Sequence, residues 1–397
     1  MTEVIEMLMI ILIVALCFIM IPFNTRPSAV LESRRKFDIF VRLYDKPYRY
    51  DVREYDYRFQ IFRSSLSRIQ KLNERQTGPD TPVQGGAIYG VTQYADLTDR
   101  EFIAQHLADL LAAEQQTMDG GGPPGVMPGV SLPPLHQKYV IESRSAEMKN
   151  DIIFSRARRE LKLPSNLPLA VDWREKGVIV PVKSQGSCGA SWAISVVDTI
   201  AAMVAIKRND RQAAVDLCHE QVIRCAANGN NGCTGGDPCR LLQWLQDESF
   251  HIGVADACPY RGMADSEQNC TLPGLAASTW DAAYEGTVVR SFSCQRFENE
   301  EHRMLHHLAT SGPIVAAVNA ISWKYYLGGV IQQHCESGAE LLNHAVEIVG
   351  YDLNATVPYY IVKNSWGTRF GNRGYVNVAI GRNVCGIANR VAFIELA

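Results

Sequence analysis

The sequence predicts an α+β fold whose helices come early and whose strands come late. Within residues 167–397, an apolar stretch without Gly or Pro runs from Trp192 to Ile206 and indicates a helix buried on most sides. Three later stretches between turn residues are typical of strands: 345–351, 359–363 and 374–378. Because the two kinds of element are segregated along the chain, we expect a helical half beside a sheet half.

The composition is that of a globular protein. The chain has 397 residues, of which 47% are apolar and 20% charged, enough for two or three domain-sized units. A formal net charge of −3 does not favour nucleic-acid binding. We expect no nucleic-acid partner, no metal and no cofactor.

Cysteine usage indicates an oxidising compartment. Ten of the eleven cysteines lie between Cys188 and Cys385, and the other is Cys17. The glycosylation sequons at Asn269 and Asn354 also favour a lumenal location. We therefore predict a lysosomal or secreted protein.

The first 25 residues predict a signal peptide or a signal anchor. Residues 7–23 form an uncharged apolar run near the lower length limit for a membrane span. Acidic residues precede this run and basic residues follow it, which taken alone would keep the rest of the chain cytoplasmic. The cysteines argue more strongly for the lumen. Whether the leader is cleaved stays open, and a membrane partner is expected only through such an anchor.

Two further segments precede the cysteine-rich part. Residues 36–112 are rich in helix formers, and six of them recur at spacings of 3 or 4 on one helix face. These six are Glu54, Arg58, Phe62, Ser65, Ile69 and Asn73. Residues 113–165 contain Gly- and Pro-rich breaks and end near basic residues 156–159, so they predict a linker with a possible processing region.

Four residues offer the groups that amide hydrolysis needs. Ser191 directly precedes the predicted buried helix and would meet the positive end of its dipole. His344 begins a predicted strand and Asn364 follows the next one, giving a base and a group to orient it. Gln185 could join the backbone N–H of Ser191 in an oxyanion hole. We expect these four to form the catalytic site.

With its neighbours, this constellation resembles the papain-like cysteine proteases. Residues 188–192 read Cys-Gly-Ala-Ser-Trp and match four of the five positions of the family's nucleophile motif. The mismatch is Ser191, which stands where the family has its nucleophilic cysteine. Residues 171–174 and 364–371 resemble two other family segments, the second with Phe370 in place of a Trp. The helix face over 54–73 and residues 90–98 similarly resemble the two motifs of cathepsin propeptides, with departures at Ser65, Thr92 and Tyr94.

The resemblance implies a papain-like two-lobe fold, a helical lobe plus a β-barrel lobe, preceded by a helical propeptide domain over 36–112. The cleft between the lobes would bind a polypeptide substrate or ligand, and the chain's own propeptide would be a partner. Cleft residues would be Gly235, Gly236 and Trp366, with Arg390 at the floor of the main specificity pocket, where it would disfavour basic residues.

The resemblance also implies the disulfides Cys188–Cys233, Cys225–Cys270 and Cys335–Cys385. Cys218, Cys239, Cys258 and Cys294 are then left over, and their three possible pairings stay open.

Ser191 leaves three hypotheses. An aliphatic hydroxyl cannot form the resting thiolate–imidazolium pair, and Asn364 is a neutral partner where serine proteases use a carboxylate. The chain is therefore expected to be an inactive or very weak peptidase homologue with a retained peptide-binding cleft. The second hypothesis is a slow serine-type hydrolase that uses Ser191, His344 and Asn364. The third is an active lysosomal cysteine endopeptidase in which Ser191 is an introduced substitution.

Overall fold

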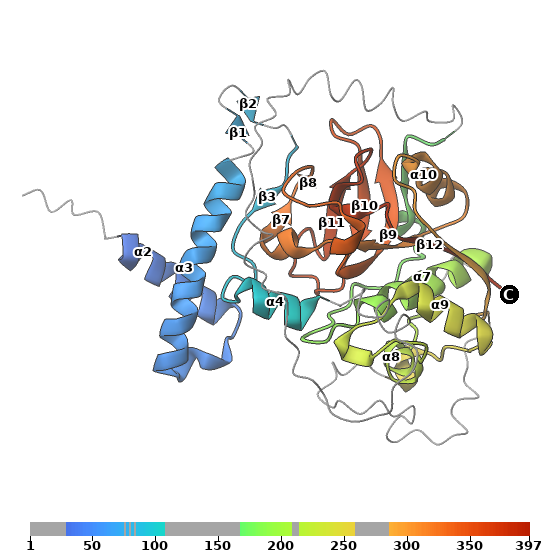
Figure 1. Ribbon diagram of the computed structural model, residues 1–397, viewed down its shortest axis with the longest axis horizontal. Helices are drawn as coiled ribbons and strands as arrows, with labels where there is room; N and C mark the ends of the chain where they lie inside the picture. The colour runs from blue at the N-terminus through green and yellow to red at the C-terminus, as the bar shows by residue number, and fades with distance from the viewer. Residues whose placement is uncertain are drawn as a thin grey trace, which may run out of the picture. The chain divides into compact units, whose positions relative to one another are not determined.

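The computed structural model in Figure 1 describes seven stretches of the chain: residues 29–74, 77–78, 81–82, 85–107, 167–208, 214–258 and 286–397. The predicted leader and linker lie outside these residues, as do Cys17, Asn269 and Cys270. No helix in the described part is long and apolar enough to cross a membrane. The chain divides into two compact units, Met1–Ser65 and Leu66–Ala397.

The first unit is built from helices around an aromatic core. It contains α2 (Ala29–Leu43), a short 3-10 helix (Pro47–Tyr50) and the first part of α3 (Val52–Glu74). Phe37 is fully buried, and its ring centroid lies 5.1 Å from that of Phe62. All six residues of the predicted helix face fall within α3, so that prediction is confirmed.

In the second unit, residues 85–107 pack on the C-terminal part of the chain. Strand β3 (Ile88–Tyr89) pairs antiparallel with β7 (Tyr326–Gly328), and α4 (Asp99–His106) follows. Thr98 and Glu101 begin α4 with a capping box, in which each side chain accepts from the other residue's backbone N–H. A two-residue ladder of β1 (Thr77–Gly78) and β2 (Thr81–Pro82) precedes this segment.

The helical part of the second unit surrounds α7 (Ser191–Arg208), which confirms the predicted buried helix. Fourteen of its eighteen residues are buried, because apolar side chains cover all of its faces. Around it lie α8 (His219–Cys225) and α9 (Pro238–Asp247). Asp237 caps α9 by accepting from the backbone N–H groups of Cys239 and Arg240.

The sheet-rich part is one eight-stranded sheet, mostly antiparallel, with the order β5-β12-β6-β9-β10-β11-β8 and with β4 added beside β9. The predicted strands over 345–351, 359–363 and 374–378 correspond to β9, β10 and β11. The strands are β4 (Ala170–Asp172), β5 (Val289–Gln295), β6 (Ile314–Val318), β8 (Val330–Ile331), β9 (His344–Asp352), β10 (Tyr359–Lys363), β11 (Tyr375–Ala379) and β12 (Val391–Leu396). Helix α10 (Glu301–Thr310) lies between β5 and β6 in the sequence.

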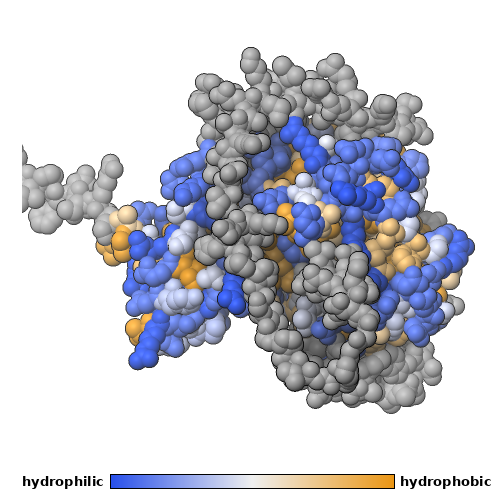
Figure 2. All heavy atoms as spheres, viewed as in Figure 1, coloured by the Kyte–Doolittle hydropathy of each residue, from blue (hydrophilic) through white to orange (hydrophobic). Residues whose placement is uncertain are grey.

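The predicted papain-like division into a helical and a sheet-rich part is therefore confirmed, with α7 packed against β9. On the face shown in Figure 2 the described residues are mostly hydrophilic, as expected where the apolar elements are buried inside.

Four disulfides join described residues. Two are pairings that the family resemblance implies, Cys188–Cys233 and Cys335–Cys385. Cys225 is disulfide-bonded as well, and the partner expected for it, Cys270, lies outside the described residues. The four left-over cysteines, whose pairing the sequence left open, form Cys218–Cys258 and Cys239–Cys294.

Candidate active site

Ser191 is the first residue of α7 and is completely buried. Its position at the helix N-terminus places its hydroxyl at the positive end of the helix dipole. The hydroxyl oxygen accepts a hydrogen bond from the backbone N–H of Ala345 at 3.2 Å. Ser191 therefore lies beside the chain segment that carries His344, although the two residues are 153 positions apart in the sequence.

His344 and Asn364 form the second part of the site. His344 begins β9, and its Nε2 lies 2.7 Å from Oδ1 of Asn364. The same amide oxygen accepts the backbone N–H of Ser365 at 2.8 Å, which fixes its orientation. Because an amide oxygen can only accept, Nε2 carries the imidazole proton and Nδ1 is left with its lone pair. Nδ1 has no hydrogen-bond partner among the described residues.

The surroundings of His344 favour the neutral imidazole. Burial lowers the pKa of His344 from 6.5 to about 4, and the neighbouring His106 acts in the same direction against the opposing bond to Asn364. The ring of Trp366 lies 4.9 Å away, centroid to centroid, and excludes water from this side. Neutral His344 can accept a proton at Nδ1, but it is a weak base for doing so.

The amide of Gln185 is already engaged. Its Nε2 donates to the carbonyl oxygen of Cys188 at 2.8 Å and to that of His106 at 3.1 Å. Its Oε1 accepts from the hydroxyl of Ser365 at 2.5 Å. His106 also places its ring Nδ1 2.9 Å from the carbonyl oxygen of Gly186. A peptide that used Gln185 as an oxyanion donor would therefore have to displace the 85–107 segment.

Aromatic side chains of the 85–107 segment cover the same region. Trp366 is 2% exposed, and the rings of Tyr94 and Phe102 pack edge-on against it at 5.6 and 5.3 Å. Phe370, from its own loop, packs on it at 4.7 Å. Trp366, which the sequence assigned to substrate binding, is in this structure an anchor for the segment that covers the site.

A buried lysine also holds the 85–107 segment in place. Lys324 is 2% exposed, and its Nζ donates to the carbonyl oxygen of Leu97 at 2.6 Å and to Oδ1 of Asp99 at 3.1 Å. The hydroxyl of Thr92 donates to the carbonyl oxygen of Lys324. Although burial opposes it, the charges of Lys324 and Arg68 keep the pKa of Asp99 below its usual value. Sequence reasoning missed Lys324, because a single lysine in a short 3-10 helix (Ile321–Tyr325) carries no recognisable pattern.

The remaining predicted site residues, Gly235, Gly236 and Arg390, have contacts that indicate structural roles. Gly235 has φ +137°, and a Cβ on Gly236 would lie 2.6 Å from the ring of Trp192, so both positions favour glycine on backbone and packing grounds. Arg390 pairs with Asp237 at 2.7 Å. Since Asp237 compensates its charge, the predicted effect of Arg390 on basic substrate residues should be weaker than that of a lone arginine.

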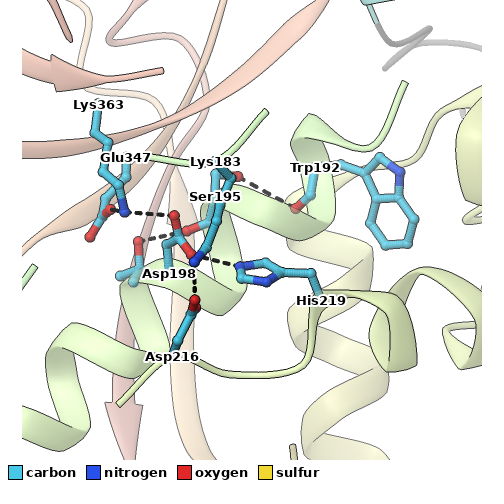
Figure 3. Close-up of polar contacts among 9 residues, drawn as sticks. Lys183, Trp192, Ser195, Asp198, Asp216, His219, Glu347 and Lys363 are labelled. Atoms are coloured by element: carbon cyan, nitrogen blue, oxygen red, sulfur yellow. Dashed lines mark hydrogen bonds and ion pairs between the residues drawn. The ribbon is translucent and has the colours of Figure 1, made fainter. Parts of the chain in front are cut away.

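Sequence reasoning also missed a group of buried charges behind the site, shown in Figure 3: Asp198, His219, Glu347 and Lys363, here called the charge network. Each interrupts an otherwise buried segment of helix or strand, which is the signal that could have revealed it. Asp198 and His219 also lie near Asp216, with their ligand atoms within 4.8 Å of one another. Lysines bond both carboxylates, so these residues form ion pairs and we infer no metal site from them.

Known proteins resemble the chain in both of its parts. Residues 167–394 match the papain family cysteine protease domain, and residues 37–102 match the cathepsin propeptide inhibitor domain. Cathepsin O from Homo sapiens is 34% identical over 334 residues, covering 84% of this chain and 86% of that protein. Cathepsin O from Mus musculus is also 34% identical, with coverages of 84% and 88%.

The fold is also similar to that of a solved papain-family proenzyme. A digestive procathepsin L2 proteinase from the larval midgut of Tenebrio molitor superposes with a TM-score of 0.67 at 26% identity, over 91% of this chain and 99% of that one. The chain therefore belongs to the papain family of cysteine proteases, as a cathepsin O-like peptidase homologue that carries its own propeptide inhibitor domain.

Proposed function

We propose that this chain is a papain-family homologue that binds polypeptide segments in a retained cleft and hydrolyses them very slowly or not at all. The observation that carries this proposal is the residue at the start of α7: Ser191, beside His344 and Asn364, where the family resemblance calls for a cysteine. A hydroxyl there cannot rest as an anion, whereas a thiol beside a helix N-terminus and a histidine can.

The environment of His344 argues against compensation by general-base catalysis. While the 85–107 segment covers the site, His344 is fully buried, and attack by Ser191 would have to turn its imidazole into a cation. In this covered form, a pKa lowered to about 4 makes that cation about 3 kcal/mol less favourable than in water. The partner that could offset this cost, Asn364, is neutral. The site is therefore poorly suited to serine-type hydrolysis.

Binding has better support than hydrolysis. The 85–107 segment already lies against Gln185 and Trp366, so the site accommodates a polypeptide through a backbone carbonyl and aromatic contacts. Without an effective nucleophile the chain should not remove this segment by itself, so we expect the propeptide to stay attached until another protease cuts it.

The test compares the natural chain with Ser191→Cys and with His344→Ala, each after removal of the propeptide by an added protease. We expect hydrolysis of a fluorogenic peptide by the natural chain to equal that by His344→Ala. Ser191→Cys should gain at least about a hundredfold, in line with a restored nucleophile and base. That gained activity should be blocked by an epoxide thiol inhibitor. Hydrolysis by the natural chain that His344→Ala abolishes would overturn the proposal.

A slow serine-type hydrolase is the second candidate. It is favoured by one observation, the lone pair on Nδ1 of His344, which no described side chain occupies. The same assay tests it, since a hydrolase of this kind loses activity on Ser191→Ala and is unaffected by thiol reagents.

The third reading, an active lysosomal cysteine endopeptidase with an introduced Ser191, makes a different prediction. Sequencing the native transcript at codon 191 separates it from the other two, because this reading requires a cysteine codon.

We further propose that the chain enters the secretory pathway, for delivery to the lysosome or for secretion. The disulfides of the C-terminal unit support this, and so does Asn354, which is exposed in the turn between β9 and β10 and begins a sequon. Endoglycosidase treatment of the protein from eukaryotic cells should reduce its apparent mass, and Asn354→Gln should reduce that shift. An unchanged mass would contradict glycosylation.

A further inference from the structure

The charge network joins α7, which begins at Ser191, to β9, which begins at His344, and to β10, which ends directly before Asn364 (Figure 3). Asp198 lies on α7, about two turns after Ser191. Glu347 lies on β9, three residues after His344, and Lys363 is the last residue of β10, directly before Asn364. Ser191 and His344 therefore each share an element with a buried carboxylate, and Asn364 directly follows the buried lysine.

Lys363 makes the connection. Its Nζ donates to Oδ2 of Asp198 at 2.6 Å and to Oε2 of Glu347 at 3.1 Å. Glu347 is also its register partner in the β9–β10 ladder. Oδ1 of Asp198 lies 2.6 Å from Nε2 of His219 on α8, so the carboxylate is held from two sides. One ammonium group thus ties α7 to both strands.

These contacts are sealed from water. The side chains of Lys363, Asp198 and Glu347 are 1%, 4% and 2% exposed. A buried charge that loses its partner is left unsolvated, so the ion pairs cannot exchange with water as surface pairs do. Asp198, Glu347, Lys363 and Asn364 together line one small pocket. The network therefore lies directly behind the residue that orients His344.

We propose that Lys363 is a positioning residue, which by bonding Asp198 and Glu347 holds Asn364, and through it the imidazole of His344, in register with Ser191. The inference concerns the site of the proposed function but does not depend on whether that site hydrolyses anything. Its readout is the state of His344 itself.

A purely structural role would make a different prediction, and the chain offers a matched control for it. Glu301 is a carboxylate as buried as Glu347, at 3% exposed, and it accepts from Tyr360 on β10 and from the backbone N–H groups of Gly381 and Asn383. None of these partners belongs to α7. Glu301→Gln should therefore lower stability without affecting His344.

The experiment uses the full-length chain labelled with ¹⁵N-histidine, with the resonance of His344 assigned through His344→Gln. In the natural chain we expect the Nε2–H tautomer, with that proton protected from solvent exchange by Asn364. In Lys363→Gln the exchange should be at least tenfold faster and both tautomers should appear. Glu347→Gln keeps an acceptor for Lys363, so the exchange rate of the His344 proton in this variant should stay within about twofold of that in the natural chain.

The outcomes are separable from those of the activity assay. A folded Lys363→Gln with an unchanged His344 signal would overturn the inference, as would an equal change in Glu301→Gln. If Lys363→Gln does not fold, Asp198→Ala, which removes the acceptor of Lys363 on α7, is the deciding variant: we expect its exchange to be at least threefold faster, and unchanged exchange would overturn the inference. Hydrolysis by the natural chain would overturn the proposed function and leave this result intact.

Discussion

His344 and Glu347 lie three residues apart on β9, both are buried, and although their partners differ, the pKa of each is shifted towards the neutral form. His344 has the neutral Asn364 as its partner, and burial lowers its pKa to about 4. Glu347 has Lys363 within 3.1 Å, but burial and the nearby Asp198 still raise its pKa to about 7. Both groups are driven towards their neutral forms.

Asp198 shows the contrasting case. It is just as buried, but Lys363 and His219 both bond it and lower its pKa to about 2 despite the opposing effect of burial. Burial alone therefore does not determine whether a side chain of this protein is ionised. Asp198 remains ionised because both Lys363 and His219 bond it, whereas Glu347 has only the shared Lys363. His344 becomes neutral because its partner Asn364 carries no negative charge. The reactive site is thus a neutral region beside a charged one.

Removing the ammonium group that Asp198 and Glu347 share should have the largest effect on stability. Lys363→Met leaves Asp198 and Glu347 buried without their ammonium partner, and we expect a loss of about 3–5 kcal/mol in the free energy of unfolding. Urea denaturation at pH 6 measures it. Asn364→Ala, which removes a neutral partner, should cost about 1 kcal/mol. Equal losses in the two variants would show that removing the buried ammonium costs no more unfolding free energy than removing a neutral partner.

The contributions of His344 and Glu347 to stability should depend on pH in opposite directions. The pKa of His344 is lowered in the fold, so its stabilising effect is complete above pH 6.5 and is lost as the pH falls towards 4. The pKa of Glu347 is raised, so its effect is complete below pH 4.5 and is lost as the pH rises towards 7.

The matching variants separate these two dependences. Relative to the natural chain, Glu347→Gln should gain stability between pH 4.5 and 7, and His344→Gln should gain it between pH 6.5 and 4, each by at most about 3 kcal/mol. Unfolding free energies measured across pH 4–8 check both slopes. Parallel curves for a variant and the natural chain would contradict the assigned shift.

The smallest effect is expected at Lys324, the other buried lysine, whose carboxylate partner Asp99 is 41% exposed. Asp99→Asn should weaken attachment of the 85–107 segment by about 1 kcal/mol, so an added protease should cut that segment about fivefold faster. Because the pKa of Asp99 is lowered, the contact should persist at pH 5. Glu395→Gln, which breaks the exposed pair with Arg290, is the control and should leave the rate unchanged.

Much of the fold could be read from local patterns. The buried helix after Ser191, the three late strands and the long helix over 54–73 all follow from hydrophobic periodicity and turn residues. Their exact ends differ by one or two residues, because caps and fraying set the boundaries. The order of Gln185, Ser191, His344 and Asn364 also indicated one site before any distance was known.

Other features depend on which segments meet in space. Two of the disulfides, Cys218–Cys258 and Cys239–Cys294, could not be chosen from four cysteines that allow three pairings. The contact of His106 with Gln185 joins residues 79 positions apart, and neither carries a pattern that points to the other. The assignment of Trp366 to substrate binding likewise did not anticipate that Tyr94 and Phe102 would cover it.

The family, the order of the reactive residues and the serine at position 191 follow from residue identity and spacing alone. The charge state of the site and the segment that covers it depend on how the chain folds. A pKa depends on burial and on donors brought from distant elements, and Lys363, Asp198 and Glu347 meet only when α7 packs against β9 and β10. The chemistry available to Ser191 is therefore limited by its own oxygen and by the neutral, covered environment in which the fold places His344.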